Sequence, residues 1–221
     1  MRQLSVIIPS RTLSNLTPCV DAVQRHDYND DIIVVWDRSG QNHFIPPSRH
    51  YRVREVETPF IYSQNCNVGI AAAAHNDVIL LNDDAMLCTM GGFTAMQRQA
   101  DEHPEFGIIA AVTDVTGQEH QHPKGIGLRE VPRMVCFICV LIPRRTIDTV
   151  GLLDEEFTGY GYDDDSYCLR VRQHGLKIGV FDHCFVDHSS LKSTFRGEQY
   201  PSAAFEENRQ IFVRKYGAHP L

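Results

Sequence analysis

The stretch that decides the fold is Val78-Ile79-Leu80-Leu81-Asn82-Asp83-Asp84-Ala85, where four apolar residues run directly into an acidic turn. A short apolar run that stops at a turn is typical of a strand buried on both faces, as in a parallel sheet. Ligands of open α/β sheets bind outside the carboxyl ends of the strands, where this turn would lie. Its oxygen atoms suit Mg²⁺ or Mn²⁺ bound together with substrate phosphates. The alternative is a solvated turn that caps the following helix.

The segments before this stretch repeat its pattern and predict an α/β sheet. Residues 4–8, 31–36 and 51–56 are expected strands, and 15–26 and 64–74 are expected helices. The β-α-β-β-α-β order with short connections predicts parallel strands joined by right-handed crossovers.

The second half of the chain has a different character, with a polar, Gly-containing stretch over 114–130 that is expected to be a loop or hairpin. The apolar run 131–142 after it predicts one long strand. Further strands are expected at 107–112, 177–181 and 185–187, helices at 89–102, 144–150, 166–174 and 201–216, and a loop at 191–199. No linker divides the chain, so one domain over 1–221 is expected, with a nucleotide-binding half (1–88) and an acceptor half (89–221).

The composition is that of an ordinary globular protein, with 43% hydrophobic and 22% charged residues and a net charge of −7. Tight binding to nucleic acid or to an anionic membrane surface is therefore not favoured. The longest apolar run, Val135 to Ile142, is far shorter than the roughly 20 residues of a membrane helix. We expect a soluble, cytoplasmic protein without stable membrane insertion.

Seven cysteines are present, and Cys136 and Cys139 form a C-x-x-C inside the expected strand 131–142. Residues three apart on a strand point to opposite faces, which predicts unpaired buried thiols in a reducing compartment. A redox or zinc pair is the alternative. His120 and His122 are expected to be surface histidines, with a metal site as the alternative.

A second acidic stretch, Gly159-Tyr160-Gly161-Tyr162-Asp163-Asp164-Asp165, precedes the expected helix 166–174. Carboxylates at a helix N-terminus are steadied by its partial positive charge, so simple capping is one interpretation. Three adjacent acids exceed what one cap requires, and an ionised carboxylate here is suited to act as general base for a hydroxyl nucleophile.

Together these segments resemble a family 2 glycosyltransferase with the GT-A fold. The likeness lies in four places and extends to about residue 190: 4–9 (the opening strand), 32–39 (the second strand and its nucleobase-contacting acid), 67–84 (the helix and the metal-binding D-x-D) and 151–175 (the segment with the catalytic base). It implies a Rossmann-like, mostly parallel central sheet with helices on both faces and a small antiparallel portion on the acceptor side. Asn82 stands where the family has the first acid of its D-x-D.

The resemblance also implies roles for individual residues. Asp84 would be the principal metal ligand, with Asn82 and Asp83 beside the metal or the ribose. His188 would be a further ligand, or else a structural histidine. Asp164 would accept the acceptor proton, with Asp163 beside it. The donor pocket would comprise Pro9, Ser10, Arg11, Asp37 and Asn67.

The implied activity is Mn²⁺- or Mg²⁺-dependent transfer of a sugar from a nucleoside-diphosphate sugar, expected to be a UDP-sugar, to a hydroxyl by inverting single displacement. Retention is the minority alternative, which a His188 metal ligand would strengthen somewhat. The acceptor is left open among a saccharide, a lipid-linked sugar, a small molecule and a modified base, and no oligomeric state is implied. The alternatives are a nucleotidyltransferase, which would need a Gly-rich loop where Ser10-Arg11-Thr12 stands, and a non-catalytic nucleotide-sugar-binding module.

Overall fold

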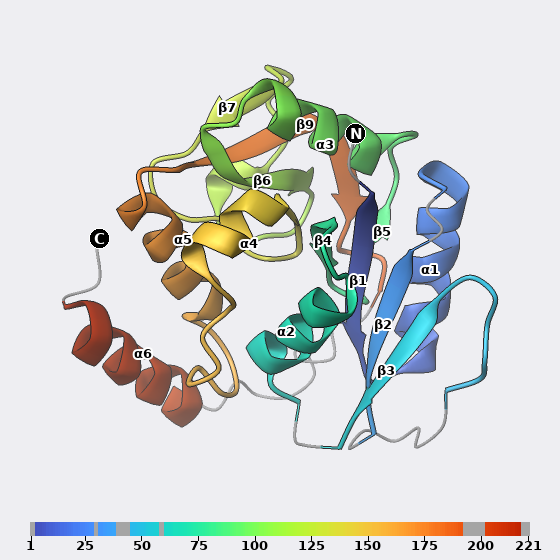
Figure 1. The fold of residues 1–221 in the computed structure, drawn as a ribbon, viewed down its shortest axis with the longest axis horizontal. Coiled ribbons are helices and arrows are strands. Elements are labelled where there is room, and N and C mark those ends of the chain that lie inside the picture. Colours follow the sequence, from blue (N-terminus) through green and yellow to red (C-terminus); the bar gives the residue numbers. More distant parts are fainter. Residues whose placement is uncertain (1–2, 29–30, 39–44, 58–59, 192–201, 218–221) are drawn as a thin grey trace.

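The computed structural model describes residues 3–28, 31–38, 45–57, 60–191 and 202–217. Within these residues, nine strands form one sheet in the order β3-β2-β1-β4-β8-β6-β9-β5, with β7 also paired to β9 (Figure 1). The first half of the chain supplies β1 (Leu4–Ser10), β2 (Ile32–Asp37), β3 (Arg52–Val56) and β4 (Asp77–Leu81). These four strands pair in parallel, which confirms the order expected from the sequence.

The second half of the chain completes the sheet with antiparallel and parallel pairs. It supplies β5 (Met86–Leu87), β6 (Phe106–Thr113), β7 (Leu128–Glu130), β8 (Cys139–Ile142) and β9 (Lys177–Asp187). β8 runs antiparallel between β4 and β6, and β6 pairs in parallel with β9. The two strands expected at 177–181 and 185–187 are one strand, whose register with β6 shifts between Phe181 and Phe185.

Helices cover both faces of the sheet, as expected for an α/β fold. α1 (Leu13–His26) and α3 (Gly92–Glu102) pack on one face. α2 (Tyr62–Ala72), α4 (Arg144–Val150) and α5 (Asp163–Gln173) pack on the other. α6 (Ser202–Tyr216) lies outside these layers, beside α5 (Figure 1), and the 3-10 turn η1 covers Glu119–Gln121. No helix in the described ranges is both long and apolar enough to cross a bilayer.

The strand pattern explains the two layers of the core. Because successive side chains of a strand point to opposite faces, Val6 and Ile8 belong to the core under α1, and Ile7 belongs to the core under α2. α2 approaches closely at Gly69, where a Cβ atom would lie only 2.2 Å from Cγ2 of Ile7. Glycine at this position therefore allows α2 to lie directly against β1.

The strand expected over 131–142 is wrong for its first eight residues, since only Cys139–Ile142 pair in the sheet. Side chains take the place of a neighbouring strand there. Gln121 donates to the carbonyl of Cys136 at 3.0 Å and accepts the Cys136 N–H at 2.6 Å, and the Tyr62 hydroxyl donates to the carbonyl of Phe137 at 2.9 Å. These backbone groups of Cys136 and Phe137 are thus satisfied by side chains and not by a ladder, which apolar patterning alone does not predict.

Candidate active site

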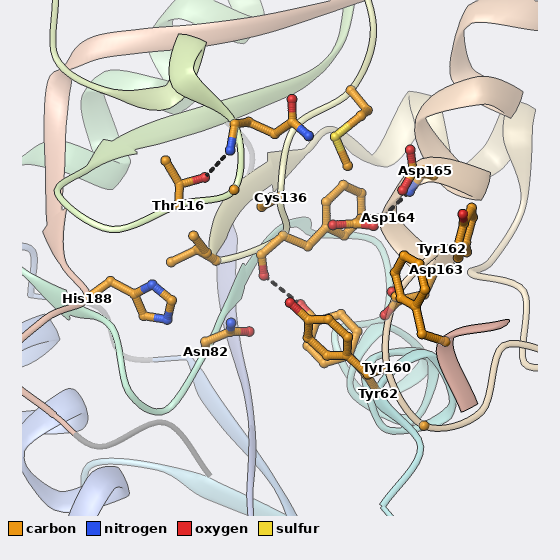
Figure 2. A pocket seen from close by; sticks show the side chains of 18 of the residues that line it. Tyr62, Asn82, Thr116, Cys136, Tyr160, Tyr162, Asp163, Asp164, Asp165 and His188 are labelled. Atoms are coloured by element: carbon orange, nitrogen blue, oxygen red, sulfur yellow. Dashed lines mark hydrogen bonds between the residues drawn. The ribbon is translucent and has the colours of Figure 1, made fainter. Parts of the chain in front are cut away.

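A cavity of about 880 Å³ opens at the carboxyl ends of β1 and β4 and contains both acidic stretches. Figure 2 shows Asn82 and His188 on one side of it and Asp163, Asp164 and Asp165 on the other. The sheet therefore brings together residues that are far apart in the chain. Pro9, Arg11, Asp83 and Asp84 also line this cavity.

The turn after β4 is held by its backbone. The Asn82 N–H donates to the carbonyl of Ile138 at 2.9 Å, and the Ala85 N–H donates to the carbonyl of Asn82 at 3.1 Å. The side-chain oxygen Oδ1 of Asn82 is buried and has no hydrogen-bond partner among the described residues. A buried acceptor without a partner is costly, so this oxygen is suited to receive a ligand.

Asp83 is held by Ser10 rather than directed freely into the cavity. The Ser10 hydroxyl donates to Oδ2 of Asp83 at 2.6 Å. Burial raises the pKa of Asp83 to about 7, and repulsion by Asp84 adds to this, while hydrogen bonds from Ser10 and Asn15 and the charge of Arg11 oppose it. Ser10 is not among the residues that line the cavity, so its contact with the site runs through Asp83.

Asp84 faces His188, whose Nε2 lies 3.2 Å from Oδ1 of Asp84. The other ring nitrogen, Nδ1, lies 2.9 Å from the carbonyl of Val115. Because a carbonyl only accepts, Nδ1 carries a proton and donates it; Nε2 pairs with Asp84 when it is protonated, and its lone pair is free to ligate a cation when it is not. Histidines that bind metals have their second nitrogen fixed in this way.

The residues present fit a divalent cation bound jointly with a substrate. No group of three His, Cys, Asp or Glu side chains in the described part of the chain forms a metal cluster. Asp84, His188 and the partnerless oxygen of Asn82 nevertheless offer two or three donors. Mg²⁺ sites in enzymes commonly combine one or two carboxylates with substrate phosphates, and this set matches that arrangement.

The second acidic stretch is the first turn of α5, which begins at Asp163 and not at the expected residue 166. The residue before it, Tyr162, has a left-handed backbone with φ of 72° and turns the chain into the helix. The Asp165 N–H donates to Oδ1 of Asp164 at 2.8 Å, which fixes that carboxylate at the helix N-terminus. The acids therefore belong to helix α5, which positions them, and do not lie in a loop before it.

Burial and mutual repulsion make these carboxylates more basic than usual. Burial raises the pKa of Asp163 to about 6, and Asp165 adds to the shift while backbone N–H groups oppose it. Burial raises the pKa of Asp164 well above its usual range, and the charges of Asp163 and Asp165 raise it further. Arg133 lies 3.9 Å from Asp165. A carboxylate with a raised pKa is a stronger proton acceptor, provided it is ionised at the working pH.

Besides Ser10, two further residues expected in the donor pocket lie outside the cavity lining. Asp37 is fully buried at the end of β2. The Asn67 amide donates to the carbonyl of Leu153 at 2.9 Å and to Glu155 at 2.8 Å, and its oxygen accepts the Leu153 N–H at 3.0 Å. Asn67 thus joins α2 to the segment that leads to α5.

The expectation of two core thiols is wrong for Cys136, which is only half-buried and lines the cavity beside Asp164 (Figure 2). Burial and the charge of Asp164 raise the pKa of the Cys136 thiol to about 12. Cys139 is buried, and all seven cysteines are free. His120 and His122 are half-buried and contact the backbone carbonyls of Met134 at 2.6 Å and Thr113 at 3.2 Å.

The sequence did not predict several residues that line the cavity: Phe60, Tyr62, Thr116, Arg133, Phe205 and Arg209. The last two belong to α6. The Gly-Tyr composition of 159–162 was the one signal for an aromatic surface, and it did not extend to α6. The residues of α6 that complete this aromatic surface come from a distant part of the chain.

Comparison with known proteins gives the fold a name. No protein-family model matches the chain. The structure of GalNAc-T7 with UDP, GalNAc and Mn²⁺ matches with a TM-score of 0.73 at 14% sequence identity. The match covers 97% of this chain and 48% of the GalNAc-T7 chain. The structure of residues 1–349 of TarS from S. aureus in complex with UDP-GlcNAc matches with a TM-score of 0.70 at 15% sequence identity. The match covers 99% of this chain and 68% of that TarS chain. This chain has a GT-A fold. The GT-A sheet explains why the turn after β4 and the start of α5 face one cavity.

A curated relative of this GT-A chain is the uncharacterized protein y4gI of Sinorhizobium fredii (strain NBRC 101917 / NGR234). The alignment is 206 residues long at 26% identity, and it covers 78% of this chain and 23% of that protein. The chain thus spans about a quarter of y4gI and about half of the GalNAc-T7 chain.

Proposed function

We propose that this GT-A chain is a glycosyltransferase that moves a sugar from a nucleoside-diphosphate sugar, specifically a UDP-sugar, to an acceptor hydroxyl. The observation that carries the proposal is a single cavity. On one side it presents side chains suited to bind a cation, and on the other side it presents a cluster of carboxylates with raised pKa values. The neighbours in fold, GalNAc-T7 and TarS, were solved with UDP and with UDP-GlcNAc, which supports this donor class.

The donor side of the cavity is assigned to Asp84, His188 and Asn82, which would hold Mn²⁺ or Mg²⁺. A bound divalent ion supplies neutralisation of the charge that grows on the leaving diphosphate. Pro9 and Arg11 border this side, and the guanidinium of Arg11 lies 5.8 Å from the ring centroid of Phe60. Asp83 belongs to this side and Ser10 supports it through its hydrogen bond to Asp83, while Asp37 and Asn67, which do not line the cavity, are assigned no contact with the donor.

The acceptor side is assigned to the start of α5. The acceptor oxygen forms its bond to the anomeric carbon while the bond from that carbon to the diphosphate oxygen breaks, and Asp164 receives the hydroxyl proton. Asp163 lies beside Asp164 and keeps it basic by repulsion. One base and one displacement give inversion at the anomeric carbon.

The test is a screen of nucleoside-diphosphate sugars for release of nucleoside diphosphate with Mn²⁺, Mg²⁺ or chelator. We expect metal-dependent release that Asp84→Ala abolishes. The matched control is Asp148→Ala, which removes an exposed acid from α4 outside this cavity. NMR of the product anomer then reports inversion. Release that ignores the chelator and Asp84→Ala would contradict the metal assignment, and binding of every donor without turnover would favour a non-catalytic module.

A further inference from the structure

The half of the cavity next to Asp164 has a wall of aromatic rings. Tyr160 and Phe205 line the cavity and are large apolar side chains left 43% and 42% exposed. The ring of Tyr162 lies 5.0 Å from the ring of Phe205. We call Tyr160, Tyr162 and Phe205 the aromatic wall. Exposed aromatic surface that is confined to a cavity is typical of a ligand-binding surface.

The backbone of this wall has one unfavourable conformation, at Tyr162, next to a conformation at Gly161 that favours glycine. Tyr162 has a φ of 72°, which is rare for a residue with a bulky side chain. Gly161 has a φ of 87°, and a Cβ atom there would lie 2.9 Å from the ring of Phe205. Strain of this kind persists where the surrounding structure imposes it, and it concentrates at functional sites.

α6 is fastened to the loop that carries the two tyrosines. Asn208 donates to the carbonyl of Gly161 at 2.8 Å, and Lys215 pairs with Asp154 at 2.6 Å. Phe212 is buried with its ring 5.5 Å from that of Tyr162. The ring of Phe205 is therefore placed by a fixed helix, which makes it part of the site and not an incidental surface residue.

The charges near the wall argue against an anionic acceptor. Arg209 of α6 lines the cavity but pairs with Glu206 at 2.7 Å, and Arg133 pairs with Asp165 at 3.9 Å. The other acidic side chains on this side of the cavity are those of Asp163 and Asp164. Ring faces beside carboxylates match a sugar, because its C–H face packs on an aromatic ring and its hydroxyls donate to carboxylates.

We propose that the acceptor is a saccharide whose ring packs on the aromatic wall, and that α6, through Phe205, determines which acceptors bind. This inference rests on the proposed function. Packing of the sugar ring on the aromatic wall orients the acceptor so that one of its hydroxyls reaches Asp164. Phe205 is a specificity residue in this scheme and takes no part in proton transfer.

The test measures binding of sugars to the full chain by saturation-transfer NMR. The probes are common pyranose disaccharides (cellobiose, maltose, lactose and chitobiose), and p-cresol and indole serve as aromatic probes. Phe205→Leu keeps an apolar side chain but removes the ring face, and Val213→Ala is a matched change at an exposed apolar residue of the same helix that does not line the cavity. We expect at least one disaccharide to bind wild type, with affinity about 3- to 10-fold lower in Phe205→Leu and unchanged in Val213→Ala.

Several results would overturn the inference. They are absence of saturation transfer to every disaccharide, transfer to the aromatic probes alone, and equal sugar affinity of wild type and Phe205→Leu. Calorimetry of UDP with Mn²⁺ on the same proteins checks folding, because Phe205 lies on the acceptor side and UDP affinity should not change. If UDP binds and no sugar binds, this inference alone fails. If sugars bind and UDP does not, the proposed function fails instead.

Discussion

Replacing Asp163 by asparagine should stabilise the protein at pH 8 and leave its stability at pH 3 unchanged. Burial raises the pKa of Asp163 from 3.8 to about 6. A shift of about two pH units corresponds to about 3 kcal/mol, and water in the cavity reduces this to about 2–3 kcal/mol. The folded state favours the neutral acid, so this stability is present below pH 3.8 and is lost as the pH rises through 6. Asparagine keeps the shape and the backbone hydrogen bonds without that loss.

The assay is urea unfolding at pH 3, 5 and 8, followed by fluorescence of the single tryptophan, Trp36, which is fully buried. At pH 8 the gain should also raise the Tm by roughly 4–12 °C for a chain of this size. The matched control is Asp154→Asn. Burial raises the pKa of Asp154, but the hydrogen bond and charge of Lys215 outweigh it and lower the pKa. This control should therefore destabilise at pH 8, with the effect disappearing as the pH falls.

A variant Asp163→Asn that is no more stable than wild type at pH 8 would refute the reasoning. It would mean that the folded protein accommodates the charge of this carboxylate at no cost. A gain of the same size at pH 3 and pH 8 would also refute it, because the gain would then come from something other than ionisation.

Three further predictions concern the cavity. Chelation and Asp84→Ala should each weaken UDP binding in calorimetry by the same factor, at least about 10-fold. His188→Ala should weaken UDP binding and Mn²⁺ binding together. Equal UDP affinity with and without chelator would contradict the metal assignment. Asp164→Asn should lower transfer about 10²–10⁴-fold with donor affinity nearly unchanged, since general-base catalysis is worth that much; near wild-type transfer would place the base elsewhere. Cys136 should react with iodoacetamide more slowly at pH 8 than the exposed Cys88, because burial and Asp164 raise the Cys136 pKa to about 12; mass spectrometry showing Cys136 alkylated first would contradict this.

The sequence determined the strands and their order in the first half of the chain. Residues 6–8, 32–36 and 78–81 are apolar throughout, and such runs need burial on both faces whatever surrounds them. Helices between strands return the chain to the same end of the sheet, so the strands run parallel, and the acids that follow them lie at one edge. The placement of Asn82-Asp83-Asp84 at the cavity follows from these local properties.

The partners of buried segments were decided only by the tertiary structure. The run 131–142 is largely apolar, but the backbone of Cys136 and Phe137 within it is satisfied by the side chains of Gln121 and Tyr62 and not by a strand. An apolar pattern indicates that a segment is buried, but it does not indicate which groups form hydrogen bonds with the backbone of that segment. For this reason Cys136 became a residue of the cavity, contrary to the expectation from its pattern.

The aromatic wall was likewise decided by packing. Phe205 of α6 packs against Gly161 and Tyr162, and α6 lies far along the chain. The same holds for the contact of His188 with Asp84, which depends on β9 ending beside the turn after β4. Contacts between distant segments leave no periodic signal in the sequence, because each side chain satisfies its local pattern equally well with or without its partner.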